Sequence, residues 1–177
     1  PGSTVLDIGA NIGVYTMFLS RWVGTDGRVI SCEPMPDTFE ILTHGINRLG
    51  LGNVSPRNCA VSDSAGTAFM EVPTWGSGGD NFYQAHLTLG RPTNDEKAVE
   101  VTTMTLDTIC EGEIGTISFV KIDVEGAELA CVRGAQQLMA HSRAGYLIEV
   151  NSDPATPDSD GAQLFDLFQK LGYVAYW

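Results

Sequence analysis

Acidic residues and glycines in this 177-residue chain stand directly after apolar runs, where they could bind a ligand. The turn Gly9-Ala-Asn-Ile-Gly13 follows the apolar run Val5–Ile8 and opens a stretch of helical spacing. Such a turn presents unpaired backbone N–H groups and the positive end of a helix dipole to a ligand. Glu33 ends the next apolar run about twenty residues later, where an acidic side chain accepts hydrogen bonds from both hydroxyls of a ribose. The pattern predicts a nucleoside-containing cofactor.

The spacing of the turn distinguishes between such cofactors. A dinucleotide site has the pattern G-x-G-x-x-G, but Asn11 occupies the position of its middle glycine, which argues against NAD. A P-loop is excluded because no G-K-[ST] follows the turn. Asp7 precedes Gly9 and suits a ligand that carries an ammonium group as well as a carboxylate. The methionine part of S-adenosylmethionine has both groups, so the turn predicts this cofactor.

These residues need a framework that brings the ends of several strands together. Strand-like and helix-like runs alternate along the chain, which predicts the α/β class with a doubly wound, mostly parallel, Rossmann-like sheet. The ligand then lies beyond the carboxyl ends of the strands, where strand order reverses. The predicted strands are Val5–Ile8, Arg28–Glu33, Val54–Val61, Ile117–Val124, Tyr146–Val150 and Tyr173–Trp177, and the predicted helices begin near Val14, Asp37, Glu125 and Asp160.

The alternation is interrupted once, after the third predicted strand. We expect a single domain over residues 1–177, with residues 62–103 forming a β-rich insertion around a loop at 75–97. Loops longer than about 15 residues inside a compact domain are usually functional or disordered. Trp75, Phe82, Tyr83 and His86 favour a lid or an acceptor-binding surface in this loop.

Five segments of the chain, in order, resemble the FkbM-type family of class I S-adenosylmethionine-dependent methyltransferases. They are VLDIGANIGVYT, GRVISCEPMPDTFEIL, NCAVSDSAG, VTTMTLDTI and FVKIDVEGAELACVRGA, and the match covers nearly the whole chain outside Trp75–Lys97. The resemblance implies methyl transfer to an oxygen of a small molecule or glycan. It also implies the donor-binding residues: Asp7, Gly9, Asn11 and Gly13 at the methionine end, Glu33 at the ribose, Ala60 and Asp63 near the adenine, and Asp123 facing the sulfonium.

Three side chains are candidates for receiving the proton of an acceptor hydroxyl: Asp123, Glu149 and His86. Asp123 and Glu149 end two predicted strands, and His86 lies among the aromatic residues of the loop. Two alternatives remain open. Magnesium held by Asp123, Glu149 and Asn151 would lower the pKa of the acceptor, or the domain could bind a cofactor or partner without catalysis.

Two charged residues have a structural interpretation beside the functional one. Lys121 lies inside a strand that should be buried on both faces, so we interpret it as a structural lysine, which requires a carboxylate neighbour. Asp63 stands in the run Ser-Asp-Ser-Ala-Gly, which is also ordinary turn chemistry.

Composition limits the partners. The net charge of −12 repels phosphate backbones and anionic lipid, so we expect no nucleic-acid or membrane partner. Cys32, Cys59, Cys110 and Cys131 are widely spread without a Cys-x-x-Cys pair, so neither zinc nor a disulfide framework, and no other metal, is predicted. No apolar run approaches the ~20 residues of a membrane span, and no leader precedes the first strand. We expect a soluble, cytoplasmic protein.

The C-terminus departs from the family pattern. Class I methyltransferases end with a seventh, antiparallel strand, whereas this chain stops at the predicted sixth, Tyr173–Trp177. An open apolar edge favours association. We therefore predict a homodimer or a further C-terminal segment.

Overall fold

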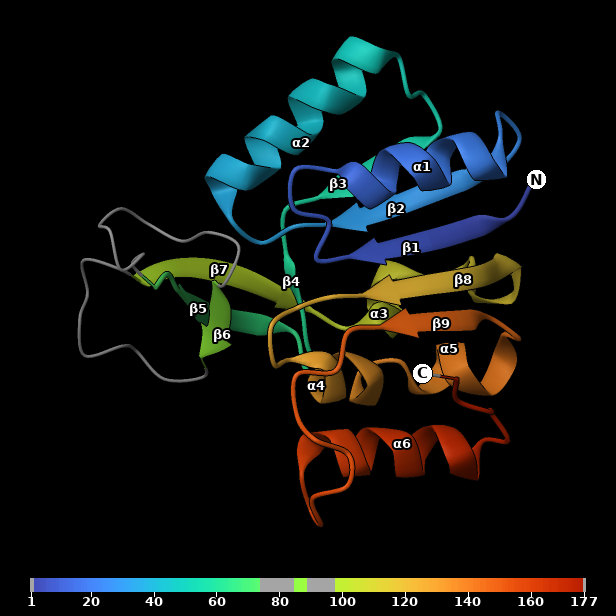
Figure 1. The fold of residues 1–177 in the computed structure, drawn as a ribbon. Helices are drawn as coiled ribbons and strands as arrows, with labels where there is room; N and C mark the ends of the chain where they lie inside the picture. Colours follow the sequence, from blue (N-terminus) through green and yellow to red (C-terminus); the bar gives the residue numbers. More distant parts are fainter. Residues whose placement is uncertain (1, 74–84, 89–97, 177) are drawn as a thin grey trace.

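The computed structural model of the chain describes residues 2–73, 85–88 and 98–176. They build a larger, parallel sheet with strand order β3-β2-β1-β8-β9 and a smaller sheet with order β4-β7-β5-β6 (Figure 1). The larger sheet consists of β1 (Thr4–Ile8), β2 (Arg28–Cys32), β3 (Val54–Arg57), β8 (Ile117–Ile122) and β9 (Gly145–Ile148). The helices are α1 (Val14–Val23), α2 (Pro36–Leu49), α3 (Leu106–Ile109), α4 (Glu128–Arg133), α5 (Gln136–His141) and α6 (Asp160–Lys170), with a 3-10 turn at Ile114–Thr116.

The larger sheet is organised around β1. All of β1 is buried, because β2 and β8 pair with its two edges and helices cover both faces. Helices α1 and α2 lie over one face, and α4, α5 and α6 lie over the other (Figure 1). Strand order runs outward from β1 to β3 and then returns to β8 on the opposite side of β1. This reversal confirms the predicted doubly wound α/β fold and places the carboxyl ends of β1 and β8 side by side.

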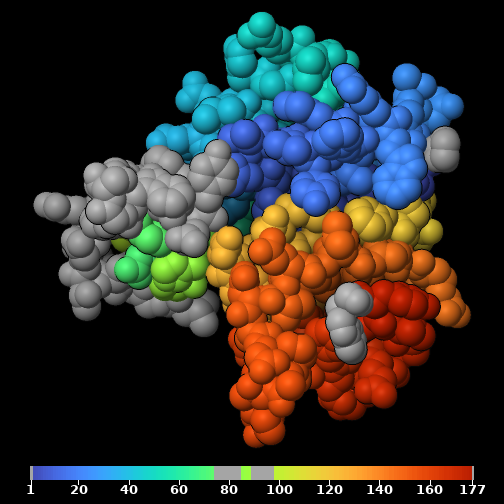
Figure 2. All heavy atoms as spheres, in the orientation of Figure 1, coloured from blue at the N-terminus to red at the C-terminus, as the bar shows by residue number. Residues whose placement is uncertain are grey.

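The smaller sheet contains the predicted β-rich insertion. Its strands are β4 (Ala60–Val61), β5 (Gly66–Glu71), β6 (His86–Thr88) and β7 (Ala98–Met104), and β5 pairs antiparallel with both β6 and β7. In the space-filling view, the light-green β6 lies next to the segment that follows β8 (Figure 2). Trp75, Phe82 and Tyr83 of the predicted loop lie outside the described residues.

The prediction of one strand over Val54–Val61 is wrong. The chain forms two strands in different sheets, because β3 pairs with β2 whereas β4 pairs with β7. Between them, the Asn58 side chain donates hydrogen bonds to the carbonyls of Glu33 and Pro34 at 2.8 and 3.0 Å, which turns the chain away from β2.

The prediction of a single helix beginning near Glu125 is also wrong. The chain forms α4 and α5 with a break at Gly134 and Ala135. Gly134 packs against the neighbouring backbone so closely that a Cβ would lie 2.2 Å from the Ser62 carbonyl oxygen. Asp107 then accepts hydrogen bonds from the first amides of α5, Gln137 N and Leu138 N, both at 2.9 Å. The second helix therefore starts afresh.

The predicted strand Tyr173–Trp177 is not formed over residues 173–176, and Trp177 is outside the described residues. After α6 the chain folds back, and the Tyr173 ring packs edge-on against Tyr146 and Phe168 at centroid distances of 5.5 and 5.3 Å. This aromatic contact uses the apolar character that suggested a strand. β9 is therefore one edge strand of the larger sheet and β3 is the other, and the homodimer stays a prediction. Among the described residues, no helix has the length and apolar character needed to cross a membrane.

Candidate cofactor and active site

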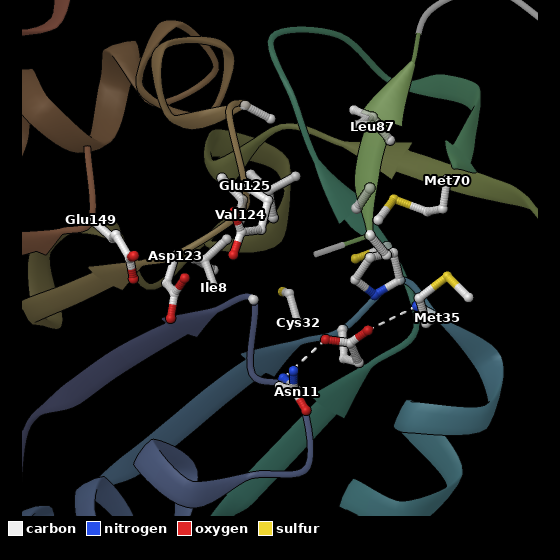
Figure 3. Close-up of a pocket in the computed structure, with 18 residues that line it drawn as sticks. Ile8, Asn11, Cys32, Met35, Met70, Leu87, Asp123, Val124, Glu125 and Glu149 are labelled. Carbon is white, nitrogen blue, oxygen red and sulfur yellow. Dashed lines mark hydrogen bonds between the residues drawn. The ribbon is translucent and has the colours of Figure 1, made fainter. Parts of the chain in front are cut away.

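A cavity of about 250 Å³ opens at the carboxyl ends of β1, β2 and β8 and is closed on one side by the smaller sheet (Figure 3). One end of the cavity is acidic, with Asp123, Glu125 and Glu149. Another part is apolar, with Met35, Met70 and Leu87. The lining residues are Ile8, Gly9, Asn11, Cys32, Glu33, Pro34, Met35, Cys59, Ala60, Val61, Met70, Ala85, Leu87, Asp123, Val124, Glu125, Ala127 and Glu149.

Glu33 is held rigidly in the wall of this cavity. Its Oε2 accepts a hydrogen bond from Asn11 N and its Oε1 one from Met35 N, both at 2.9 Å (dashed in Figure 3). The pKa of Glu33 is raised, because the effect of burial outweighs the lowering by these two backbone hydrogen bonds. A carboxylate has about four acceptor positions, so two remain for a ligand. This geometry suits the two hydroxyls of a ribose.

The turn between β1 and α1 is fixed by contacts within the protein. Asn11 adopts a left-handed conformation with φ of 50°, and its Oδ1 accepts a hydrogen bond from Ile12 N at 2.7 Å. A Cβ on Gly9 would lie 1.8 Å from the Asp123 carbonyl oxygen, and one on Gly13 would lie 2.6 Å from Leu42 Cδ1. Packing against backbone thus requires glycine at position 9, whereas Leu42 Cδ1 is the end of a flexible side chain and can move. At position 13 it is the left-handed φ of 93° that favours glycine.

Asp7 lies beneath the turn and is fully buried. Its Oδ2 accepts a hydrogen bond from Thr16 Oγ1 at 2.6 Å, and its Oδ1 lies 3.4 Å from Lys121 Nζ. Lys121 Nζ also lies 3.2 Å from Asp123 Oδ2. The carboxylate neighbours that the sequence interpretation of Lys121 required are therefore present.

Asp123 and Glu149 follow the adjacent strands β8 and β9, and their carboxyl groups lie beside each other (Figure 3). The negative charge of Asp123 raises the pKa of Glu149, and so do burial and a hydrogen bond between the two groups. The pKa of Glu125 is raised by burial first and then by the charges of Glu149 and Asp123, with a smaller contribution from Glu128. This end of the cavity attracts cations and holds protons more tightly than separate carboxylates do.

Some predicted site residues line the cavity and others do not. Gly9, Asn11, Glu33, Ala60, Asp123 and Glu149 line it. Asp7 and Gly13 lie behind its wall. Asp63 is exposed at a turn, where its Oδ1 accepts a hydrogen bond from Ser64 Oγ at 3.0 Å.

His86 is also absent from the lining, and it belongs to the strand β6 and not to a loop as predicted. Its Nε2 lies 4.0 Å from Glu71 Oε2. The neighbouring Ala85 and Leu87 line the cavity instead, and the charge of His86 opposes the rise in the pKa of Glu125.

Sequence reasoning missed the apolar lining residues Met35, Met70 and Leu87. Met35 could have been found because it follows Glu33 and Pro34 at the end of a predicted strand. Met70 and Leu87 have no such signal, because only the packing of the smaller sheet against the larger one brings them to the cavity.

The alternative set of magnesium ligands, Asp123, Glu149 and Asn151, stays a prediction. Asn151 Nδ2 donates hydrogen bonds to Glu128 Oε1 at 3.2 Å and to Glu125 Oε2 at 3.4 Å, so its amide nitrogen is paired with these two carboxylates. Within residues 2–73, 85–88 and 98–176, no group of three or more His, Cys, Asp or Glu side chains is placed to hold a metal ion.

The residues that line the cavity fit S-adenosylmethionine. Glu33 matches the ribose, the apolar walls match a flat base, and the acidic end matches a sulfonium and an ammonium group. A doubly wound sheet with this site at its switch point is the arrangement expected of a class I S-adenosylmethionine-dependent methyltransferase domain. The chain belongs to the FkbM methyltransferase family, because the family model described as "Methyltransferase FkbM domain" matches residues 7–175. S-adenosylmethionine is the cofactor of this class.

Curated relatives agree with this assignment. The hexuronic acid methyltransferase AglP of Haloferax volcanii is 31% identical over 129 residues, which are 72% of this chain and 48% of AglP. The 31-O-demethyl-FK506 methyltransferase FkbM of Streptomyces tacrolimicus is 28% identical over 160 residues, which cover 77% of this chain and 60% of that protein. The chain therefore spans about half to three fifths of these relatives.

Solved structures show the same fold. The crystal structure of methyltransferase FkbM from Methylobacillus flagellatus KT matches with a TM-score of 0.62 at 16% identity, over 96% of this chain and 36% of that one. Aeropyrum pernix fibrillarin, solved with S-adenosyl-L-methionine, matches with a TM-score of 0.52 at 13% identity, over 97% of this chain and 57% of that one.

Proposed function

We propose that this domain transfers a methyl group from S-adenosylmethionine to a hydroxyl oxygen of a small molecule or glycan. The carrying observation is the pair of adjacent carboxylates, Asp123 and Glu149, at the acidic end of the cavity. The names of the relatives support the acceptor class, since one is a hexuronic acid methyltransferase and another a 31-O-demethyl-FK506 methyltransferase. Bound S-adenosylmethionine supplies an electrophilic methyl group on a sulfonium sulfur.

Different residues along the cavity bind different parts of the cofactor in this proposal. Glu33 accepts hydrogen bonds from the ribose, and Ala60 borders the base together with the apolar wall. Asn11 and Gly9 border the methionine end, which Asp7 and Gly13 support from behind. Holding the acceptor oxygen in line with the methyl carbon supplies much of the acceleration by proximity.

Glu149 receives the proton of the acceptor hydroxyl in this proposal. An ordinary glutamate is a weak base at neutral pH, and a pKa raised by the charge of Asp123 makes Glu149 a better one. His86 contributes through the electrostatics of Glu125 and not by direct contact with the cavity lining.

The test of the proposed function is a transfer assay with tritiated S-adenosylmethionine and a panel of sugars and other small-molecule alcohols, with the methylated atom located by NMR. Label on a hydroxyl oxygen supports the proposal. Label found only on nitrogen or carbon overturns the acceptor class, and a protein that binds the donor but labels no acceptor in the panel points to the non-catalytic alternative.

Replacing Glu149 by glutamine should slow methyl transfer by about a hundredfold, the lower part of the range for loss of a general base, because positioning is retained. The affinity for S-adenosylhomocysteine should fall only to the level that the wild type shows at acidic pH, where Glu149 is protonated. In the wild type, transfer falls as the pH falls through the raised pKa of Glu149, because the protonated carboxyl cannot accept a proton. This decrease in transfer at low pH should be absent in Glu149→Gln.

The matched control is Glu111→Gln, an exposed glutamate remote from the cavity, which should keep the wild-type rate and pH profile. An unchanged rate in Glu149→Gln would assign the proton to another group.

Chelation tests the magnesium alternative directly. We expect EDTA to leave transfer unchanged, because Asn151 is engaged with Glu125 and Glu128 and Glu149 already accounts for proton removal. Loss of transfer with EDTA, restored by added Mg²⁺, would favour a metal held by Asp123 and Glu149 instead.

A further inference from the structure

Lys121 is a buried cation at the boundary between the protein interior and the cavity. Its side chain is only 5% exposed. Its Nζ donates a hydrogen bond to the Gly9 carbonyl at 2.8 Å and lies 3.2 Å from Asp123 Oδ2 and 3.4 Å from Asp7 Oδ1. The ammonium also lies 5.1 Å from the centre of the Tyr15 ring. It therefore contacts two residues that line the cavity, Gly9 and Asp123.

A lysine that only neutralised Asp7 would need no contact with the cavity wall. A buried charge is tolerated when it is paired, and the pair Asp7–Lys121 satisfies that condition inside the protein. The shorter contacts of Nζ, however, are those to Gly9 and Asp123. Lys121 thus ties the turn after β1 to the end of β8, the two segments that form the methionine end of the cavity.

We infer that Lys121 is a positioning residue of the methyl-donor site, which orients the Gly9 carbonyl and the Asp123 carboxylate and offsets the charge of the Asp123–Glu149 pair. The inference rests on the proposed function only where it concerns proton acceptance by Glu149. The part that concerns donor binding stands on the contacts of Lys121.

The sign of the electrostatic effect follows from the groups around Glu149. Asp123 and Glu128 raise its pKa, and Lys121 is the cation that lowers it. Glu125 adds a further negative charge beside them. Removing the ammonium leaves only negative neighbours among these groups, so the pKa of Glu149 rises further. Every process that needs this pair ionised then requires a higher pH.

The experiment measures S-adenosylhomocysteine binding by calorimetry from acidic to mildly alkaline pH. In Lys121→Met we expect an affinity about tenfold lower at neutral pH, the effect of one charge-assisted hydrogen bond, because Asp123 loses its orientation. We also expect the loss of affinity on acidification to begin at a higher pH than in the wild type.

Lys121→Met leaves the Asp7 carboxylate buried without its cation and could therefore unfold the protein. The double variant Asp7→Asn/Lys121→Met removes both charges and keeps Thr16 beside a polar side chain. If Lys121 only neutralised Asp7, this double variant would show the wild-type pH profile, and the inference would be overturned. If Lys121 positions Asp123, the double variant folds and keeps the shifted profile.

Lys170→Met is the matched control, because it removes a lysine from the ion pair with Asp166 on α6, where both side chains are mostly exposed. It should bind as the wild type does. Failure of the proposed function can be told apart from failure of this inference. If only the proposed function is wrong, no methyl group is transferred to hydroxyl acceptors, but the Lys121 variants still lose S-adenosylhomocysteine affinity at a higher pH than the wild type.

Discussion

Alanine in place of Gly9 is expected to lower the free energy of unfolding by more than about 4 kcal/mol, a loss found only for severe core defects. The new Cβ would lie 1.8 Å from the carbonyl oxygen of Asp123 and 2.8 Å from its carbonyl carbon. Both atoms belong to the backbone, and Asp123 N donates a hydrogen bond to the Ile8 carbonyl at 3.1 Å. Relief of the clash therefore separates the ends of β1 and β8.

Gly50→Ala is the matched control for this prediction. Gly50 follows α2 in the left-handed conformation with φ of 65°, close to the 72° of Gly9, but a Cβ there would meet nothing within 4 Å. It should lose only about 1–2 kcal/mol, the value for a left-handed residue that gains a Cβ. Urea unfolding of both variants measures the difference. Equal losses would mean that backbone conformation alone, and not the contact with Asp123, requires glycine at position 9.

The packing of Gly9 shows what a sequence can and cannot say about such a turn. The residue types identified the turn, its helix and its cofactor class. They did not reveal that the glycine lets β8 approach β1, because that contact joins residues far apart in the chain. The close approach of β8 to β1 also places the Gly9 carbonyl within hydrogen-bonding distance of Lys121 Nζ. The packing of the turn and the chemistry of the cavity therefore depend on one another.

Strands were predictable where their pattern is dictated by burial. β1, β2 and β8 lie in the middle of a sheet covered on both faces, so most of their residues are apolar and each run has a clear end. The predictions failed where a distant partner redirects the chain. Asn58 ends β3 through the Glu33 and Pro34 carbonyls, and Tyr173 packs on Tyr146 where a strand was expected.

The site was predictable to the same degree. Acidic residues at strand ends must meet at one edge of a parallel sheet, which is why Glu33, Asp123 and Glu149 were found from spacing alone. The interactions between these charges were not predictable. The sequence indicates only that the strand with Lys121 is buried, and not that Lys121 lies near both Asp7 and Asp123. A sequence therefore locates the charges, and the structure decides which of them share a proton or a cation.

Replacing Glu33 by alanine should weaken S-adenosylhomocysteine binding by about 10²–10⁴-fold, since two hydrogen bonds to a charged acceptor are lost at about 1.5–3 kcal/mol each. The buried carboxylate is fixed by Asn11 N and Met35 N, so it meets the ligand without reorganisation. Glu33→Gln should not rescue binding fully, because its amide group would turn an N–H₂ donor toward one of these N–H donors. Calorimetry at one pH measures both variants, with Glu40→Ala on the exposed side of α2 as the control.

A shortened ligand separates the two ends of the cavity. Methylthioadenosine keeps the nucleoside of the cofactor and lacks its amino-acid end. Glu33→Ala should weaken its binding as strongly as that of S-adenosylhomocysteine, whereas Glu149→Gln should leave the binding of methylthioadenosine unchanged. If Glu33→Ala weakened only S-adenosylhomocysteine, Glu33 would belong to the methionine end, and the carboxylates at β8 and β9 would have to face the ribose. Met35 and Met70 lie away from the Asp123 and Glu149 end of the cavity (Figure 3), and Met35 N donates a hydrogen bond to Glu33, which is why we expect the nucleoside there.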